Sequence, residues 1–215
     1  MNLWLWFVIL VPSVVLHEVA HGYVAYLFGD PTAKERHRLT LNPLSHIDLF
    51  GTILLPALLL LTHNPAFGYA KPVPVTVSRL RKPRKQMLWV ALSGPAVNIL
   101  LSAVGLLICR LTIGTGFNAL GQIVQYPKDP NLFEFGEYLG IVNLILAVFN
   151  LIPVPPLDGS AIIERFVPSR HLASYYRLRV WSMPLVIVLV IVLFRLTTIG
   201  SSWLFHLENG WYDLL

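Results

Sequence analysis

Three long runs without a charged residue constrain the fold of this chain more than any other feature. They cover residues 49–70, 86–109 and 138–157 and are 22, 24 and 20 residues long. A helix that crosses a bilayer needs about 20 mostly apolar residues. Only 13% of the residues are charged, roughly half the usual share of about 25% in soluble domains. The chain is therefore predicted to be a polytopic membrane protein, which excludes a soluble enzyme, a disordered chain and a disulfide-stapled secreted domain.

The net charge of +5 resides in connectors between apolar runs. We interpret it as the positive-inside signal and as contact with anionic headgroups, so no nucleic-acid partner is expected. Connectors 30–49, 63–85 and 159–180 hold three, six and four basic residues, whereas connector 110–136 holds two. The first three are expected on the cytoplasmic side of the cell membrane and the fourth outside.

We expect a single membrane domain over residues 1–215 with an all-α fold, built as a helical bundle. Its three core helices are predicted over about 3–28, 87–109 and 137–158, the third broken by prolines from Asn150 onward. A last apolar helix is predicted over about 181–196.

Two shorter segments complete the expected architecture. The uncharged run 50–62 reaches only about 20 Å as a helix, against a hydrocarbon core of about 30 Å. It is therefore predicted to be a re-entrant hairpin, with a kinked full crossing as the alternative. Residues 69–77 alternate and contain two prolines, which is typical of an extended segment or an edge strand. A short helix is predicted over 160–166.

The first apolar helix contains His17-Glu18-Val19-Ala20-His21. Histidines at i and i+4 share one helix face, so both imidazoles can reach a single ion. Glu18 stands beside that site, where it can serve as the general base for water. Such groups are costly in a membrane helix and point to function. The alternative is a hydrogen-bonded polar cluster that joins helices.

A third ligand must come from another part of the chain, because a hydrolytic zinc site needs three protein ligands and one open position. The lone Cys109 excludes a multi-thiolate site. Asp158 is the best candidate, since it follows a proline-broken helix end, and irregular backbone at membrane depth must line a cavity or be buried. An equally good interpretation makes Asp158 the N-cap of the helix over 160–166.

Three motifs together resemble the site-2 protease family of intramembrane zinc metalloproteases. They are His17-Glu18-x-x-His21, Ser93-Gly94-Pro95-x-x-Asn98 and Asn150-x-x-Pro153-x-Pro155-x-Leu157-Asp158-Gly159. Their order and their placement on three core helices match that family. The chain is most similar to short members that lack PDZ or CBS domains.

The resemblance implies one Zn²⁺ ion held by His17, His21 and Asp158, with Glu18 as the catalytic base. It also implies that Asn150 binds the substrate backbone and that Asn98 lies near the site, as a second substrate-binding candidate. The implied activity is hydrolysis of peptide bonds in or near transmembrane segments of membrane proteins, in the cytoplasmic half of the bilayer. A metal-binding transporter would give the glutamate no role, and a catalytically silent binding protein would not need it.

Two further features keep two interpretations each. His46 is either a fourth ligand or an anchor of its polar connector. Residues 69–77 either pair with an unwound substrate by β-addition or form a surface loop stiffened by prolines.

Overall fold

The computed structural model describes residues 3–54, 69–117, 122–172 and 199–215, together with residues 58, 61, 120, 174, 175, 177 and 182. Most of these residues are helical, which confirms the expected all-α class. The elements are helices α1 (Leu3–Leu27), α2 (Thr32–Glu35), α4 (Pro83–Thr112), α5 (Pro130–Leu151), α6 (Ser160–Phe166) and α8 (Ile199–Tyr212), strands β1 (Ile113–Phe117) and β2 (Ile123–Pro127), 3-10 turns at Pro43–His46, Val77–Arg79 and Ser169–His171, and a π-helical turn at Leu49–Leu54.

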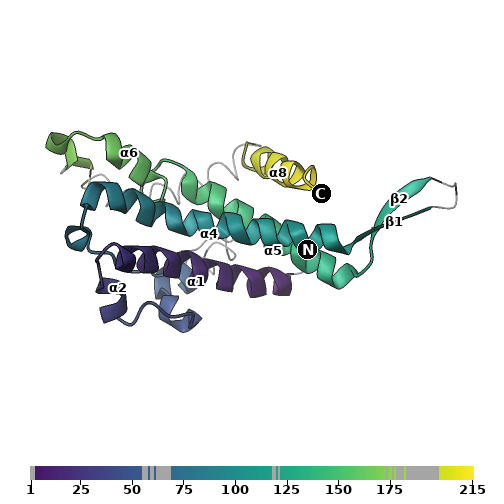
Figure 1. The fold of residues 1–215 in the computed structure, drawn as a ribbon, viewed down its shortest axis with the longest axis horizontal. Coiled ribbons are helices and arrows are strands. Elements are labelled where there is room, and N and C mark those ends of the chain that lie inside the picture. The colour runs from purple at the N-terminus through teal and green to yellow at the C-terminus, as the bar shows by residue number, and fades with distance from the viewer. Residues whose placement is uncertain are drawn as a thin grey trace.

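Helices α1, α4 and α5 lie side by side and form the body of the molecule (Figure 1). Each is long and apolar enough to cross a membrane, over Trp4–Leu27, Pro83–Thr112 and Pro130–Leu151. Large apolar side chains such as Leu100 face outward, while polar Asn98 is fully buried. This arrangement suits a bundle surrounded by lipid and confirms that the protein is a multi-pass membrane protein.

The basic connectors gather at one end of the bundle. The backbone N–H of Arg81 donates to the carbonyl of Phe28 at 3.2 Å, so the chain leaves α1 and enters α4 at the same end. The Arg84 side chain reaches the carbonyl of Val167, which brings the end of α6 to that same end. The segment between α1 and α4 therefore starts and finishes on one side of the bundle.

Two predicted elements fall wholly or partly outside the described residues. Within the predicted hairpin 50–62, only residues 50–54, 58 and 61 are described. Its re-entrant path therefore stays a prediction, as does the last helix over 181–196, of which only Ser182 is described.

Helix α5 begins at Pro130 instead of near Glu137. The Asp129 carboxylate accepts hydrogen bonds from the backbone N–H groups of Asn131 and Leu132, both at 3.1 Å. A capping aspartate followed by proline is a strong start for a helix. The prediction of Glu137 as the start was wrong because that Asp-Pro signal was overlooked.

Connector 110–136 is more ordered than its glycine content indicates. Strands β1 and β2 pair antiparallel, with Ile113 opposite Pro127 and Phe117 opposite Ile123. The hairpin projects beyond the bundle, at the end opposite α6 (Figure 1). Helix α4 also extends beyond its predicted bounds of 87–109, since it begins at Pro83. Proline is well tolerated in the first turn, because the N–H that it lacks would have no partner within the helix.

Candidate metal centre

Three ligand-type side chains from two elements meet inside the bundle. His17 and His21 lie one turn apart on α1, with their Nε2 atoms 3.0 Å apart. Asp158 belongs to the turn between α5 and α6, and its Oδ2 lies 3.1 Å from His17 Nε2 and 3.3 Å from His21 Nε2. His17 is buried and Asp158 is half-buried. Within the described residues, this is the group of His, Cys, Asp and Glu side chains whose ligand atoms could hold one ion.

The protonation pattern of the two histidines leaves lone pairs in the centre of the group. His17 Nδ1 lies 2.5 Å from Asn98 Oδ1, and His21 Nδ1 lies 2.7 Å from the Val90 carbonyl. Both partners are oxygen acceptors, so each neutral ring carries its proton on Nδ1 and a lone pair on Nε2. Asp158 Oδ2 is buried without a hydrogen-bond partner. When both rings are neutral, three electron-pair donors point at one another, which is unfavourable unless a metal ion or a proton lies among them.

The spacing of these atoms fits zinc. Tetrahedral bonds of about 2.0–2.1 Å put neighbouring ligand atoms about 3.3 Å apart. The three observed separations range from 3.0 to 3.3 Å. Two imidazoles and one carboxylate are also a donor set that catalytic zinc accepts. The residues present therefore fit a zinc ion.

The Ser93-Gly94-Pro95 segment lets the α4 backbone approach the ligand atoms. A β-carbon on Gly94 would lie 2.5 Å from His21 Nε2 and 2.6 Å from His17 Nε2. Ser93 Oγ donates to the Val90 carbonyl at 2.6 Å, the same oxygen that accepts from His21. This segment therefore provides room for the two rings.

Glu18 makes a contact that spacing could not predict. Its Oε2 accepts a hydrogen bond of 2.9 Å from the backbone N–H of Val73. Glu18 does not belong to the three-residue group, although it is next to His17 in the chain. The carboxylate thus links α1 to the extended segment, which we define as residues 71–76.

The extended segment runs without a strand partner among the described residues and is held at several points. Its far end is fixed by buried Asp30, whose Oδ2 accepts from the Thr76 N–H at 2.5 Å. Its near end is fixed by Lys71, whose N–H donates to the His46 carbonyl at 2.9 Å. Gly22 on α1 faces Val73, and a β-carbon there would lie only 2.6 Å from Val73 Cγ1. The segment therefore packs directly on the helix that carries the two histidines.

A second anchor holds the turn that follows the extended segment. Arg79 donates to the Glu35 carboxylate of α2 at 2.6 Å. That hydrogen bond and the Glu35 charge raise the pKa of Arg79 above its ordinary value, which is already high enough to keep a guanidinium charged. Both side chains are about half exposed, and an exposed pair of this kind contributes little to stability.

Two candidate residues occupy positions beside the centre. Asn98 on α4 contacts His17 directly. Asn150 lies in the last turn of α5, where its Nδ2 donates to the Leu146 carbonyl at 2.9 Å. The Asn150 carbonyl accepts from the Gly159 N–H at 2.7 Å, which folds the Asp158 turn back against α5.

His46 lies apart from the three-residue group. Its ring is buried, and Nε2 lies 2.9 Å from the Thr40 carbonyl. With its own carbonyl accepting from Lys71, it joins the connector after α2 to the extended segment. The anchoring interpretation agrees with these contacts.

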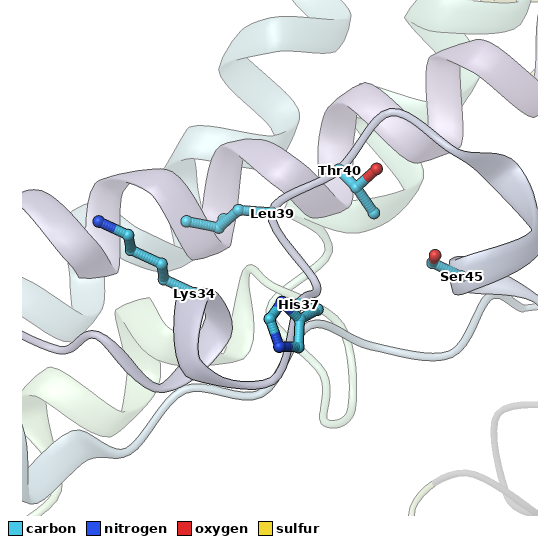
Figure 2. A pocket seen from close by; sticks show the side chains of 5 residues that line it. All are labelled: Lys34, His37, Leu39, Thr40 and Ser45. Carbon is cyan, nitrogen blue, oxygen red and sulfur yellow. The ribbon is translucent and has the colours of Figure 1, made fainter.

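A surface cavity of about 420 Å³ lies over α2 and the connector that follows it. Lys34, His37, Leu39, Thr40 and Ser45 line it, and none of them belongs to the three-residue group. In Figure 2 the Lys34 side chain points away from Ser45. The lining groups do not converge on one ligand position.

Sequence reasoning missed three buried polar residues. Ser13 and Asn143 lie in the bundle and are hydrogen-bonded to each other, and Asp30 follows the end of α1. All are 2% exposed or less. Ser13 and Asn143 lie in apolar helices, where polar groups usually have a function or a partner. That signal could have found both of them.

Comparison with known proteins finds a peptidase family and relatives whose names include zinc metalloprotease. The model of Peptidase family M50 matches residues 5–193. The chain is 37% identical over 204 residues to "Putative zinc metalloprotease YwhC" of Bacillus subtilis (strain 168), covering 95% of this chain and 85% of that protein. It is 26% identical to "Putative zinc metalloprotease Rip2" of Mycolicibacterium smegmatis, over 94% of this chain and 70% of that protein. "Zinc metalloprotease MJ0392" of Methanocaldococcus jannaschii is 24% identical over 77% of this chain and 35% of its own length. No solved structure gives a significant match.

Proposed function

The chain belongs to peptidase family M50 and is a zinc metalloendopeptidase, and on this basis we propose that it cleaves transmembrane segments inside the bilayer. In this proposal His17, His21 and Asp158 hold a single zinc ion. The observation that carries it is the convergence of three lone-pair donors at 3.0–3.3 Å from α1 and from the turn after α5.

The depth of the group supports an intramembrane site. His21 lies six residues before Leu27, the end of α1, which is roughly 9 Å at 1.5 Å per residue. If α1 spans the bilayer, both histidines lie below its surface. The basic connectors gather at this end of α1, so the positive-inside rule supports a site in the cytoplasmic half.

A bound zinc ion would supply Lewis acidity, which polarises a carbonyl and lowers the pKa of water to about 7. Glu18 then acts as the general base, because its carboxylate stands next to a ligand without being one. It accepts a proton from water and delivers it to the leaving nitrogen. The Val73 N–H holds one carboxylate oxygen at 2.9 Å, which restricts the orientation of the base.

A helical substrate must unwind before cleavage, because its carbonyls are engaged in i to i+4 bonds. The extended segment lies against the helix that carries the ligands and has no strand partner among the described residues. It can receive an unwound strand by β-addition mainly through its carbonyl groups, because the N–H groups of Lys71, Val73 and Thr76 are already engaged. Its two prolines have no N–H to donate. Asn150, at the end of α5 beside the Asp158 turn, is the proposed side-chain contact to the substrate backbone.

The Glu18→Gln variant tests this function. The amide keeps the size of the side chain and an oxygen for the Val73 N–H, but it cannot accept the proton. In proteoliposomes containing a transmembrane peptide, we expect cleavage to fall at least about 100-fold while bound zinc stays at the wild-type level. The measurement pairs peptide fragments by mass spectrometry with metal analysis.

Two results would refute the proposal. Wild-type cleavage by Glu18→Gln would remove the glutamate from the mechanism. Undiminished cleavage by His17→Ala, with zinc still bound, would move the metal site elsewhere.

A further inference from the structure

A chain of buried hydrogen bonds crosses the bundle and ends on one of the proposed ligands. It joins Ser13 on α1, Asn143 on α5 and Asn98 on α4 to His17. Ser13, Asn143 and Asn98 are 2%, 0% and 0% exposed, respectively. The proposed function gives Ser13 and Asn143 no role.

The direction of these hydrogen bonds is fixed from the far end. The Ile9 carbonyl can only accept, so the Ser13 hydroxyl donates to it at 2.8 Å. Ser13 Oγ is then the acceptor for Asn143 Nδ2 at 2.9 Å. The Leu139 carbonyl accepts from the same Nδ2, also at 2.9 Å. Two acceptors therefore hold the amide nitrogen of Asn143 on one side and turn its oxygen toward Asn98.

The same direction continues to the histidine. Asn143 Oδ1 accepts from Asn98 Nδ2 at 2.8 Å, which leaves Asn98 Oδ1 facing His17 Nδ1 at 2.5 Å. An oxygen at that position requires a proton on Nδ1, so the lone pair of the neutral ring lies on Nε2. If the Asn98 amide were reversed, its NH₂ group would face Nδ1. The ring proton would move to Nε2, and His17 could not bind a metal through that atom.

We propose that Asn143 and Ser13 are positioning residues that set the tautomer of His17 through the orientation of the Asn98 amide. This inference rests on the proposed metal site. His21 needs no such chain, because its Nδ1 faces the Val90 carbonyl at 2.7 Å, and a backbone carbonyl has only one possible role. When the hydrogen-bond partner on the second nitrogen of a ligating histidine is mutated, metal affinity typically falls 10–100-fold.

Variants at Asn143 separate this role from simple packing. Asn143→Leu keeps a similar volume but removes both the acceptor and the donors. In Asn143→Asp, a protonated carboxyl group accepts from Asn98 and donates to Ser13, so the direction of the chain is preserved. Ser13→Ala removes one of the two acceptors that orient the Asn143 amide. Ser102→Ala is the matched control, since Ser102 is also a buried serine, on α4 one turn after Asn98.

The measurement is the zinc dissociation constant of the full-length protein in nanodiscs, obtained by chelator competition and accompanied by the melting temperature. We expect zinc binding to weaken about 10–100-fold in Asn143→Leu, and about threefold to tenfold in Ser13→Ala, which keeps the Leu139 acceptor. Asn143→Asp should stay within about threefold of the wild type, and Ser102→Ala should match it. The absorption spectrum of the Co²⁺-substituted protein should change in Asn143→Leu and not in Asn143→Asp.

Three results would overturn the inference. The first is wild-type zinc affinity in Asn143→Leu with a lowered melting temperature, which would mean that the amide only joins helices. The second is an equal loss in Asn143→Leu and Asn143→Asp. The third is unchanged affinity in Ser13→Ala, which also decides the matter if Asn143→Leu does not fold. Zinc binding that persists in His17→Ala would instead refute the proposed metal site itself.

Discussion

At the scale of single residues, the proposed metal centre depends on the smallest residue near it. Gly94 is the point where the α4 backbone touches the imidazoles, and the space for a β-carbon is already filled by His17 and His21. The close contact between α1 and α4 and the position of the two imidazoles therefore both depend on Gly94. The Ser93-Gly94-Pro95 motif therefore leaves room for the two proposed ligands as well as bringing helices together.

Gly94→Ala should for this reason remove metal without unfolding the helix. Alanine favours an α-helix over glycine by about 1 kcal/mol, but its β-carbon at 2.5–2.6 Å from both Nε2 atoms must displace the rings. We expect zinc affinity to fall at least about 100-fold, measured by chelator competition. Gly210→Ala is the control, because nothing lies within 4 Å of the added carbon. Wild-type zinc affinity in Gly94→Ala would contradict the site geometry.

At the scale of elements, the extended segment is held by two carboxylates on its N–H groups. Glu18 accepts from Val73 and Asp30 accepts from Thr76. Asp30 is fully buried and also accepts from the Thr32 N–H at 3.0 Å, so it joins α2 to the segment. The segment keeps its place beside the histidines through these bonds.

Asp30→Ala should therefore loosen the extended segment. The change leaves the N–H groups of buried Thr32 and half-buried Thr76 without an acceptor, and a buried group in that state costs about 1–3 kcal/mol. Hydrogen exchange of the amides over 71–76 should accelerate at least about tenfold. Asp129→Ala removes a capping aspartate from the opposite end of the bundle and should leave those amides unchanged. Slow exchange in both variants would show that Asp30 does not hold the segment.

The elements also show what the sequence could and could not predict. The helix over 160–166 and the end of α1 follow from local signals, and both agree with the structure to within a residue. The β1–β2 hairpin was missed because Ile113–Phe117 contains two glycines, which weaken a strand pattern. Its order comes from pairing across the sheet, which local propensity does not contain.

The candidate site divides in the same way. The i and i+4 spacing puts His17 and His21 on one face, which the sequence alone predicts. The approach of Asp158 rests on contacts between residues far apart in the chain, and spacing left it undecided between ligand and N-cap. The Gly159 N–H and the Asn150 carbonyl fold that turn back against α5. The hydrogen bonds that join Asn98, Asn143 and Ser13 connect three helices, so the sequence could point to these polar residues but not to their pairing.

At the scale of the whole molecule, the bundle buries polar side chains together with apolar ones and exposes many large apolar side chains. Amide, hydroxyl and imidazole groups occupy the centre of the α1, α4 and α5 bundle, while large apolar side chains cover its outside. Polar groups inside a membrane need hydrogen-bond partners, and here the chain of hydrogen bonds from Ser13 ends at His17, one of the proposed zinc ligands. The fold and the site therefore depend on the same buried hydrogen bonds.

The zinc content of the purified full-length protein and of its Asp158→Ala variant tests the central claim most directly. We expect about one zinc per chain in the wild type, since three ligands and one open position describe a single catalytic ion. Asp158→Ala should retain well below half of that amount, while Asp213→Ala, an exposed aspartate near the C-terminus, should retain all of it. A full complement of zinc in Asp158→Ala would contradict the account.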